Sequence, residues 1–388
     1  MIIKLLKTMK AIKQYSFFIL IFLSTALSAC RKDLQVIPEE QVGVIPADPS
    51  RQLKGFYLVN EGNMNMNKAS LDYMDFSTGV YRRNIYNQTN PAQINGLGDV
   101  ANDVGIYGSK LYVVVNISNK VEVMDAKSGK RIQQINVTNP RYITFKDGKA
   151  YVSAYLGQVG VPDAPNGVVI QIDTNSLKEE RRIEVGRQPE EMAIVGQKLY
   201  VANSGGYSPK DYDTRVSVID LNSFSLVKNI EVAINLHRVK ADKYGDIYVT
   251  SRGNYLNIHS KIFVIDTKTD LVKTRFDIGA SNLVIDEDIA YFYGSEWSNS
   301  TGRFTLSYGM IDVKDEKILN KKFINDGTEA NITVPYGITV DKYSKEVFVT
   351  DAKNYFSPGV LYCFDPSGKL KWKVVTGDIP AHFAMVYK

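Results

Sequence analysis

Short runs of apolar and alternating residues recur along the chain, and the clearest copy spans residues 198–232. In this copy an apolar run, Leu199 to Val201, is followed by a polar loop rich in glycine and tyrosine. Two alternating runs come next, joined by a turn after Asp220. A period of two is typical of half-buried β-strands, and the residues between the runs are turn formers. The pattern therefore predicts three strands and their connections.

This unit occurs seven times. The apolar run begins at Phe56, Leu111, Ala150, Leu199, Ile247, Ala290 and Val347. Each run is followed by a strand that ends in an aspartate: Asp75, Asp125, Asp173, Asp220, Asp266, Asp312 and Asp365. Seven aspartates could bind metal, but each lies in its own local turn, where a carboxylate accepts backbone N–H bonds. We interpret them as turn residues.

A shorter strand precedes most of the apolar runs, as at 141–145 and 191–195. One unit is then four strands in about 48 residues, which is typical of a β-propeller blade. Nothing suitable precedes Phe56, but residues 379–387 repeat the leading-strand pattern after the seventh copy. We expect this segment to pair into blade one and close the ring. The sequence predicts an all-β fold over 55–388, a seven-bladed propeller of four-stranded antiparallel blades.

The first 29 residues have the pattern of a signal peptide. Four lysines, the last of them Lys13, precede an apolar run from Phe17 to Leu27, and small residues and Cys30 follow. This order is that of a secretory signal. The sequence Leu-Ser-Ala-Cys resembles the lipobox of bacterial lipoproteins, which implies that Cys30 is lipidated; the alternative is an ordinary secretory signal that contains a cysteine. Met1 and Met9 both stay open as the start.

Residues 30–54 contain three prolines among charged and small residues, and we expect a flexible tether there. The formal net charge of the chain is +5, and the four lysines before Cys30 account for most of it, which leaves about +1. No basic stripe is present, so the sequence offers no footprint for nucleic acid. Cys363 lies in an apolar strand and is interpreted as a core residue.

Long loops are predicted to cluster on one face of the ring. In a four-stranded blade, the loops between strands two and three and the connections to the next blade emerge on the same face. These loops are long at 60–69, 155–167, 203–214, 251–260, 294–305 and 351–359, whereas the turns of the other face are short, as at 146–148.

Aromatic and amide residues are interleaved in these loops. The aromatic residues are Tyr155, Tyr207, Tyr212, Tyr255, Trp297, Tyr355 and Phe356, and the amides are Asn60, Asn63, Asn116, Asn203, Asn254, Asn299 and Asn354. Amphipathic rings with amides between them suit a large, neutral, partly apolar ligand. The alternative is that tyrosine and asparagine merely suit exposed turns. The clustering of so many on one face favours the binding hypothesis.

Charged and titratable residues are expected near the same face. The connections between blades add Arg141, Arg187, His237 and Tyr336, and the 251–260 loop adds Arg252. The arginines could bind a phosphate or a carboxylate, or pair with acids such as Glu190, and both interpretations stay open. His237 lacks a metal-binding spacing, so we interpret it as a polar loop residue.

Catalytic motifs are not evident in the sequence. It contains no nucleophile elbow, no glycine-rich phosphate loop and no metal-binding histidine pair. Glu61 and Asp351 begin two of the loops and could face the central channel, as the acids of metal-dependent propeller hydrolases do. Two positions in seven blades support that alternative only weakly.

The repeated (Leu/Ile)-Tyr-Val and Val-(Ile/Met)-Asp-x-x-(Ser/Thr) motifs and the Pro-led inner strand resemble YncE-type, surface-layer-like seven-bladed propellers, over about Phe56 to Tyr387. With the lipobox at Cys30, the tether and the Asn-Glu-Gly-Asn segment at 60–63, the chain is also similar to the surface lipoproteins of Bacteroidetes vitamin B12 uptake loci (BtuG-type).

That resemblance implies a lipid-anchored protein of the outer membrane, exposed at the cell surface, without a cofactor of its own. It would bind cobalamin or a related corrinoid and hand it to a TonB-dependent outer-membrane transporter, without turnover. The resemblance leaves open whether the cobalt is ligated by the protein. The alternatives from other classes are a surface propeller that binds a protein or a glycan, and a metal-dependent propeller hydrolase.

Overall fold

The computed structural model describes residues 41–157, 161, 164–298 and 302–388. The predicted signal peptide, Cys30 and the first part of the predicted tether lie outside these ranges, and so does Asn299. Within the described ranges, no helix has both the length and the apolar character needed to cross a membrane.

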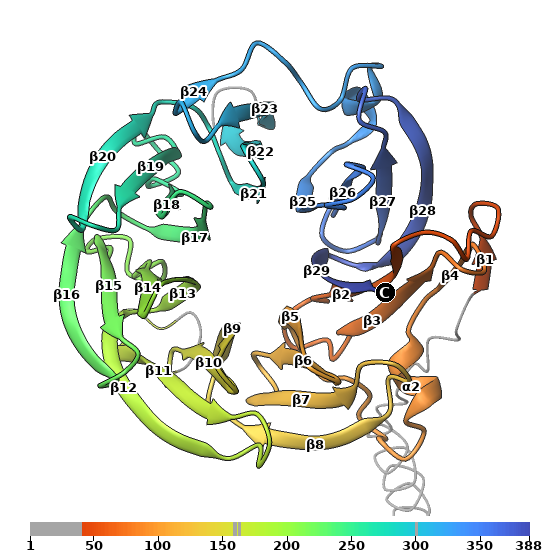
Figure 1. Ribbon diagram of the computed structural model, residues 1–388, viewed down its shortest axis with the longest axis horizontal. Coiled ribbons are helices and arrows are strands. Elements are labelled where there is room, and N and C mark those ends of the chain that lie inside the picture. Colours follow the sequence, from red (N-terminus) through yellow and green to blue (C-terminus); the bar gives the residue numbers. More distant parts are fainter. Residues whose placement is uncertain (1–40, 158–160, 162–163, 299–301) are drawn as a thin grey trace, which may run out of the picture. The chain divides into compact units, whose positions relative to one another are not determined.

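Seven antiparallel sheets form a ring, and their first strands surround its centre (Figure 1). Blades two to four consist of β5 (Ala101–Tyr107), β6 (Lys110–Val115), β7 (Lys120–Asp125) and β8 (Arg131–Asn136); β9 (Pro140–Lys146), β10 (Lys149–Ala154), β11 (Asn166–Asp173) and β12 (Glu179–Arg187); and β13 (Pro189–Val195), β14 (Lys198–Asn203), β15 (Arg215–Asp220) and β16 (Ser225–Glu231).

The remaining blades follow the same order. Blades five to seven consist of β17 (Leu236–Ala241), β18 (Asp246–Ser251), β19 (Lys261–Asp266) and β20 (Leu271–Phe276); β21 (Asn282–Asp286), β22 (Ile289–Ser298), β23 (Arg303–Asp312) and β24 (Lys317–Ile318); and β25 (Pro335–Val340), β26 (Val347–Asp351), β27 (Pro358–Phe364) and β28 (Leu370–Asp378). Two short helical segments, α2 (Ile85–Thr89) and η1 (Thr328–Asn331), lie in connections.

Blade one joins the two ends of the described chain. Its strands are β2 (Leu53–Asn60), β3 (Ser70–Asp75), β4 (Val80–Arg82) and, as the innermost strand, β29 (Pro380–Tyr387). The pairing of β29 with β2 places Met385 opposite Phe56 and His382 opposite Val59. This confirms the predicted closure of a seven-bladed, all-β propeller by its C-terminal strand, which leaves no inner edge of blade one unpaired.

The folded region begins earlier than the sequence predicts. A fifth strand, β1 (Gln41–Gly43), pairs with β4, and Val44 and Ile45 pack against the apolar cluster of blade one. Arg51 forms an ion pair of 3.0 Å with Asp341 of blade seven. Residues 41–54 are therefore part of the domain rather than of a flexible tether. Strand β1 has only three residues, and backbone hydrogen bonds hold it. It is too short to show an alternation of apolar and polar residues, so the sequence pattern could not reveal it.

The core lies between neighbouring blades. The second strand of a blade is buried on both faces, which explains why residues 111–115 of β6 form a continuous apolar run rather than an alternating one. Tyr112 and Val114 pack toward blade three, where Ala150 and Val152 complete one such cluster.

The seven aspartates act as turn residues, as the sequence predicts. Each accepts a backbone N–H bond two or three residues on, at Asp75, Asp125, Asp173, Asp220, Asp266, Asp312 and Asp365. The hydrogen bonds that Ser128 donates to Asp125 lower the pKa of this carboxyl group. No group of three or more potential metal ligands is present in the described part of the chain.

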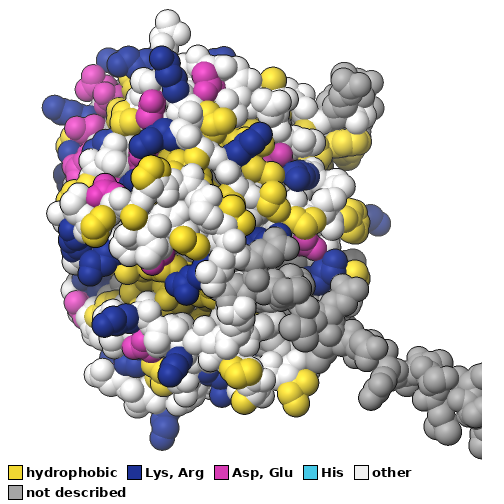
Figure 2. Space-filling model, turned by 90° about the vertical axis from the view of Figure 1, so that its right-hand side faces the viewer, with side chains coloured by type: hydrophobic (Ala, Val, Ile, Leu, Met, Phe, Trp, Pro, Cys, Tyr) yellow, Lys and Arg dark blue, Asp and Glu magenta, His cyan; other side chains and the backbone are white. Residues whose placement is uncertain are grey.

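One predicted loop proved to be a hairpin. Residues 294–305 were expected to form a loop, but β22 and β23 pair without interruption from Ile289 and Asp312 to Ser298 and Arg303. The hairpin extends beyond the other blades' second strands and carries Trp297. On the side of the ring that bears β1 and β28, Lys and Arg side chains are interspersed with Asp and Glu (Figure 2), in keeping with the near-neutral charge balance.

Candidate functional site

A cavity of about 740 Å³ lies on the ring axis, because residues of all seven blades line it. Inner strands form its floor and the loops between second and third strands form its rim. The floor includes Arg141 and Tyr142 of β9, Glu190 of β13, and His237 and Arg238 of β17. The cavity therefore opens on the face where the sequence predicts the long loops.

Irregular strand pairing aims the floor residues at the axis. The register shifts at the start of six inner strands, among them β5, β9, β13 and β17. The shifts in β25 and β29 complete the set. Such bulges are frequent next to functional sites because they redirect side chains. Here they turn the second and third residues of these strands, such as His237 and Arg238, toward the channel.

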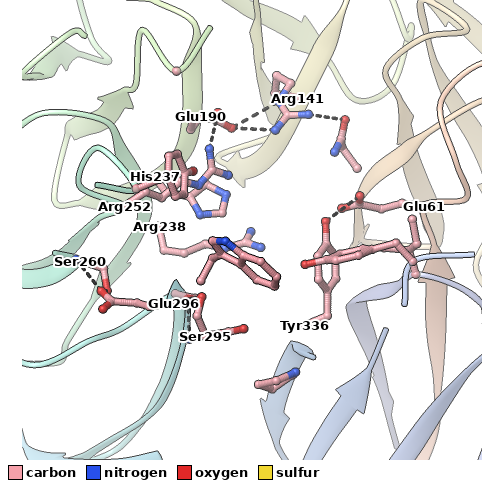
Figure 3. Close-up of a pocket in the computed structure, with 18 of the residues that line it drawn as sticks. Glu61, Arg141, Glu190, His237, Arg238, Arg252, Ser260, Ser295, Glu296 and Tyr336 are labelled. Carbon is pink, nitrogen blue, oxygen red and sulfur yellow. Dashed lines mark hydrogen bonds and ion pairs between the residues drawn. The ribbon is translucent and has the colours of Figure 1, made fainter. Parts of the chain in front are cut away.

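Glu190 joins two arginines on one side of the floor (Figure 3). Its side chain lies 2.9 Å from Arg141 and 3.6 Å from Arg252, and it accepts a 2.7 Å hydrogen bond from the Tyr155 hydroxyl. Arg141 also donates to the Asn102 side chain, at 2.7 Å. Burial alone would raise the pKa of Glu190, but the two arginines hold that pKa below its ordinary value. Glu190 is therefore an ionised counter-ion.

Arg238 has a different environment. Its guanidinium donates to the Tyr142 hydroxyl and to Nε2 of His382, both at 3.0 Å, and the Tyr142 hydroxyl also contacts Nε2 of His237 at 3.0 Å. Burial and the neighbouring arginines lower the pKa of both histidines well below the ordinary value. Both are therefore neutral, and within the described residues no carboxylate forms an ion pair with Arg238.

Glu61 lies on the opposite side of the cavity (Figure 3). It accepts a 2.9 Å hydrogen bond from the Tyr336 hydroxyl and makes no ion pair within the described residues. Burial raises the pKa of Glu61, and more distant arginines offset this only in part. Glu296, a third carboxylate at the cavity, accepts a 2.6 Å bond from the Ser260 backbone N–H.

Aromatic rings line part of the cavity, mainly at its rim. Edge-to-face pairs join Tyr155 to Tyr207 at 6.4 Å and Tyr336 to Tyr355 at 6.0 Å between ring centroids. Tyr255 and Trp297 are 56% and 47% exposed, so their rings are open to a ligand at the mouth. Exposed aromatic surface of this kind is typical of a binding site rather than of a core.

The structure brings many of the predicted site residues to this cavity. Those that line it are Asn63, Arg141, Tyr155, Tyr207, His237, Arg252, Tyr255, Trp297, Tyr336 and Tyr355, and Asn116 also does so. Four assignments to the connections between blades need correction, because Arg141, His237 and Tyr336 are residues of inner strands and Arg187 is the last residue of β12. His237 is buried at the axis rather than placed in a polar loop.

The other predicted residues, Asn60, Arg187, Asn203, Tyr212, Asn354 and Phe356, do not line the cavity. Several have local partners instead. The Asn60 and Asn203 amides are buried and bond to Ser70 and Ser217. Arg187 pairs with Asp211 at 3.0 Å, and Asn354 caps the backbone of its own turn. Asp351 accepts backbone bonds from Val334 and, within its own loop, from Lys353.

Sequence analysis missed Tyr142 and Arg238 and named Glu190 only as a partner. A signal was available, because Arg141, Glu190 and Tyr336 each follow a proline that starts an inner strand. The residue directly after the proline lines the cavity in all three strands, and in β9 the next residue, Tyr142, does so as well. The weakness of this signal is that a bulge, rather than simple alternation, determines which residues turn inward.

A family model described as a domain of unknown function (DUF5074) matches residues 54–378. The chain belongs to the DUF5074 family. The match covers most of the propeller, including all of the inner strands except β29. No curated protein matches this DUF5074 chain.

Solved structures similar to the DUF5074 chain share its fold. A quinonprotein alcohol dehydrogenase-like protein from Bacteroides thetaiotaomicron VPI-5482 is 16% identical with a TM-score of 0.62, over 86% of this chain and 78% of that one. Hydrazine synthase from Kuenenia stuttgartiensis is 18% identical with a TM-score of 0.57, over 73% and 88%. The computationally designed Ika8 protein is 10% identical with a TM-score of 0.55, over 89% and 94%. At these identities the likeness concerns the fold alone.

Proposed function

We propose that this DUF5074 propeller binds a corrinoid in its axial cavity, without turnover, and delivers it to a TonB-dependent outer-membrane transporter. One observation carries the proposal: a cavity of about 740 Å³ combines an open aromatic rim with a polar, charged floor. A corrinoid combines a broad apolar macrocycle with peripheral amides and a phosphate-bearing nucleotide loop. Rings match the first feature, and the polar floor matches the others.

The amides of the cavity favour a ligand that itself carries amides. The Asn63 side chain donates to the Tyr355 carbonyl at 2.6 Å, and the Asn116 side chain donates to the Pro140 carbonyl at 3.0 Å. These bonds fix the orientation of both side chains. No bond from the described residues reaches their amide oxygens, which are therefore available to accept from ligand amides.

Two observations support delivery at a membrane. The signal-like segment that ends at Cys30 favours a lipid anchor. Met64, Leu256 and Ile258 line the mouth of the cavity and are 45%, 75% and 45% exposed, which provides an apolar rim for a transporter. Loss of the chain should lower corrinoid uptake by intact cells, and unchanged uptake would argue against delivery.

Tryptophan fluorescence and calorimetry with cyanocobalamin test the binding step. The chain has two tryptophans: Trp297 is 47% exposed at the rim, and Trp372 is 7% exposed in the core. Cyanocobalamin should quench Trp297 in a saturable way, and Trp297→Ala should weaken the calorimetric affinity about tenfold or more. Phe356→Ala is the matched control, because Phe356 is an exposed ring outside the cavity. If micromolar cyanocobalamin produces no binding heat and no quenching, the corrinoid proposal is refuted and a protein or glycan partner is favoured.

A further inference from the structure

We propose that the floor of the axial cavity is an oxyanion site in which Arg238 and Arg252 bind a phosphate group. The inference uses the cavity of the proposed function and deepens it, but it holds for any phosphate-bearing ligand. It starts from an imbalance of charge. Three guanidinium groups, those of Arg141, Arg238 and Arg252, line the cavity, and of the carboxyl groups that line it only Glu190 forms an ion pair with any of them within the described residues.

Glu190 does not neutralise all three cations. It forms a close pair with Arg141 at 2.9 Å, whereas its 3.6 Å separation from Arg252 is too long for a hydrogen bond. Within the described residues, Arg252 makes no side-chain hydrogen bond. Neither Arg238 nor Arg252 therefore donates a hydrogen bond to a carboxylate in the described part of the chain.

Arg238 is the deepest of the three cations. It is 4% exposed, yet its Nε has no hydrogen-bond partner among the described residues. Its two protein acceptors, the Tyr142 hydroxyl and Nε2 of His382, are neutral groups. A buried cation is unfavourable unless it is paired and fully hydrogen-bonded. An anion in the cavity would supply the missing charge, and it would bind through Nη2, which makes no hydrogen bond within the described residues.

The guanidinium of Arg238 is held ready for such a ligand. Figure 3 shows it projecting into the space between the Arg252 side of the cavity and the Glu61–Tyr336 pair. Tyr142 packs against it, with the guanidinium 5.3 Å from the ring centroid, and accepts one of its N–H bonds. A planar guanidinium with free N–H groups matches the oxygens of a phosphate in a fork-like geometry.

The acids nearest to this space do not oppose an anion strongly. Glu190 is engaged by Arg141 and Tyr155, and Glu296 by Ser260. Glu61 is held by Tyr336. The aromatic rim then adds contact for whatever apolar group bears the phosphate. The ligand class that fits this site is a phosphate ester with an apolar or aromatic substituent.

Calorimetry on the full chain tests the site with phenyl phosphate, inorganic phosphate, benzoate and phenol. Phenyl phosphate should bind at least tenfold more tightly than phenol and more tightly than benzoate. Arg252→Gln should weaken the affinity for phenyl phosphate at least tenfold. Arg238→Gln should have the same effect if its melting curve shows a folded protein. Arg187→Gln is the matched control, because Arg187 pairs with Asp211 outside the cavity and should leave binding unchanged.

The outcomes separate this site from the corrinoid proposal. Absence of phosphate and phenyl phosphate binding, equal binding by wild type and Arg252→Gln, or tighter binding of benzoate would each overturn the oxyanion site. Phenyl phosphate binding without cyanocobalamin binding would support the site and refute the corrinoid. If cyanocobalamin binds, Arg252→Gln does not change its affinity and phenyl phosphate does not bind, the corrinoid proposal is supported and the oxyanion site is refuted.

Discussion

Two glutamates on opposite sides of one cavity have opposite charge behaviour. Glu190 lies 2.9 Å from Arg141 and its pKa is lowered, although burial acts to raise it. Glu61 lies beside the Tyr336 hydroxyl, at 2.9 Å, and burial raises its pKa. The difference shows that burial alone does not set the charge of a carboxyl group. Contact with a cation decides it, because the Coulomb interaction falls with distance while desolvation acts on both groups.

The same difference divides the cavity into two functional halves. The side of Glu190 contains the three arginines and provides fixed charge. The side of Glu61 contains Tyr336 and Tyr355, whose rings stand edge to face at 6.0 Å, and provides apolar surface with few charges. A ligand with an anionic end and an apolar body fits this asymmetry. The predictions below test whether the two halves differ as described.

The largest effect is expected from Glu190→Gln. The change removes the carboxylate between Arg141 and Arg252 and leaves buried positive charge without a counter-ion. Breaking a buried ion pair from one side destabilises a protein by about 3–5 kcal/mol. Urea unfolding monitored by circular dichroism measures the loss.

Glu179→Gln is the control for that substitution. Glu179 pairs with Arg182 at 2.6 Å, but the two side chains are 33% and 51% exposed. A solvent-exposed pair contributes about 0–1 kcal/mol. Equal losses in the two variants would contradict the assignment of Glu190 as the buried counter-ion of the cavity.

The propeller itself was predictable from sequence because its signals are local. Alternation marks each strand, and the aspartate turns recur because each carboxylate, such as that of Asp125, is satisfied within its own turn. Even the closing strand could be found, since residues 380–387 repeat the pattern of the other inner strands. Strand β1 was not predictable, because its pairing with β4 depends on backbone bonds alone.

The site was predictable only in part, because similar residues in one loop point in different directions. Asn203 and Tyr207 both belong to the 203–214 loop, yet the Asn203 side chain turns inward to Ser217 while Tyr207 lines the cavity. Arg187 and Arg252 were both predicted at the ligand-binding face, but Arg187 pairs with Asp211 outside the cavity whereas Arg252 lines it. Such choices depend on partners distant in the chain and on strand bulges, which no local pattern encodes.

An intermediate effect is expected from removing the two tyrosine hydroxyls that contact the glutamates. Tyr155→Phe loses a 2.7 Å bond to ionised Glu190, and a bond to a charged acceptor contributes about 1.5–3 kcal/mol. Tyr336→Phe loses a 2.9 Å bond to Glu61, which forms no ion pair within the described residues and whose pKa is raised by burial, and a typical intramolecular hydrogen bond contributes about 0.5–1.5 kcal/mol. Both variants keep the ring, so each is the packing control of the other. Urea unfolding at neutral pH should show the larger loss for Tyr155→Phe, and the reverse order would contradict the comparison.

The smallest effect is expected on the pH dependence of stability, to which Glu61 and Glu190 should contribute with opposite signs. Because the folded-state pKa of Glu61 is raised, the unfolded chain releases this proton first as the pH rises. Stability therefore falls from the unfolded pKa of about 4.3 up to the folded pKa of Glu61, with a slope of at most about 1.4 kcal/mol per pH unit for one proton. Glu61→Gln removes this loss, so the variant should gain stability relative to wild type between pH 4 and pH 7.

Glu190 should contribute with the opposite sign. Its folded-state pKa is lowered, so its stabilisation is present above the unfolded pKa of about 4.3 and is lost as the pH falls through the folded pKa. Unfolding free energies of wild type, Glu61→Gln and Glu190→Gln across pH 3–8 measure both contributions. The difference between wild type and Glu190→Gln should shrink toward low pH. The deficit of wild type relative to Glu61→Gln should also shrink there, because Glu61 is then protonated in both the folded and the unfolded chain. Parallel pH profiles for all three proteins would show that neither carboxyl group titrates differently in the folded and unfolded chains.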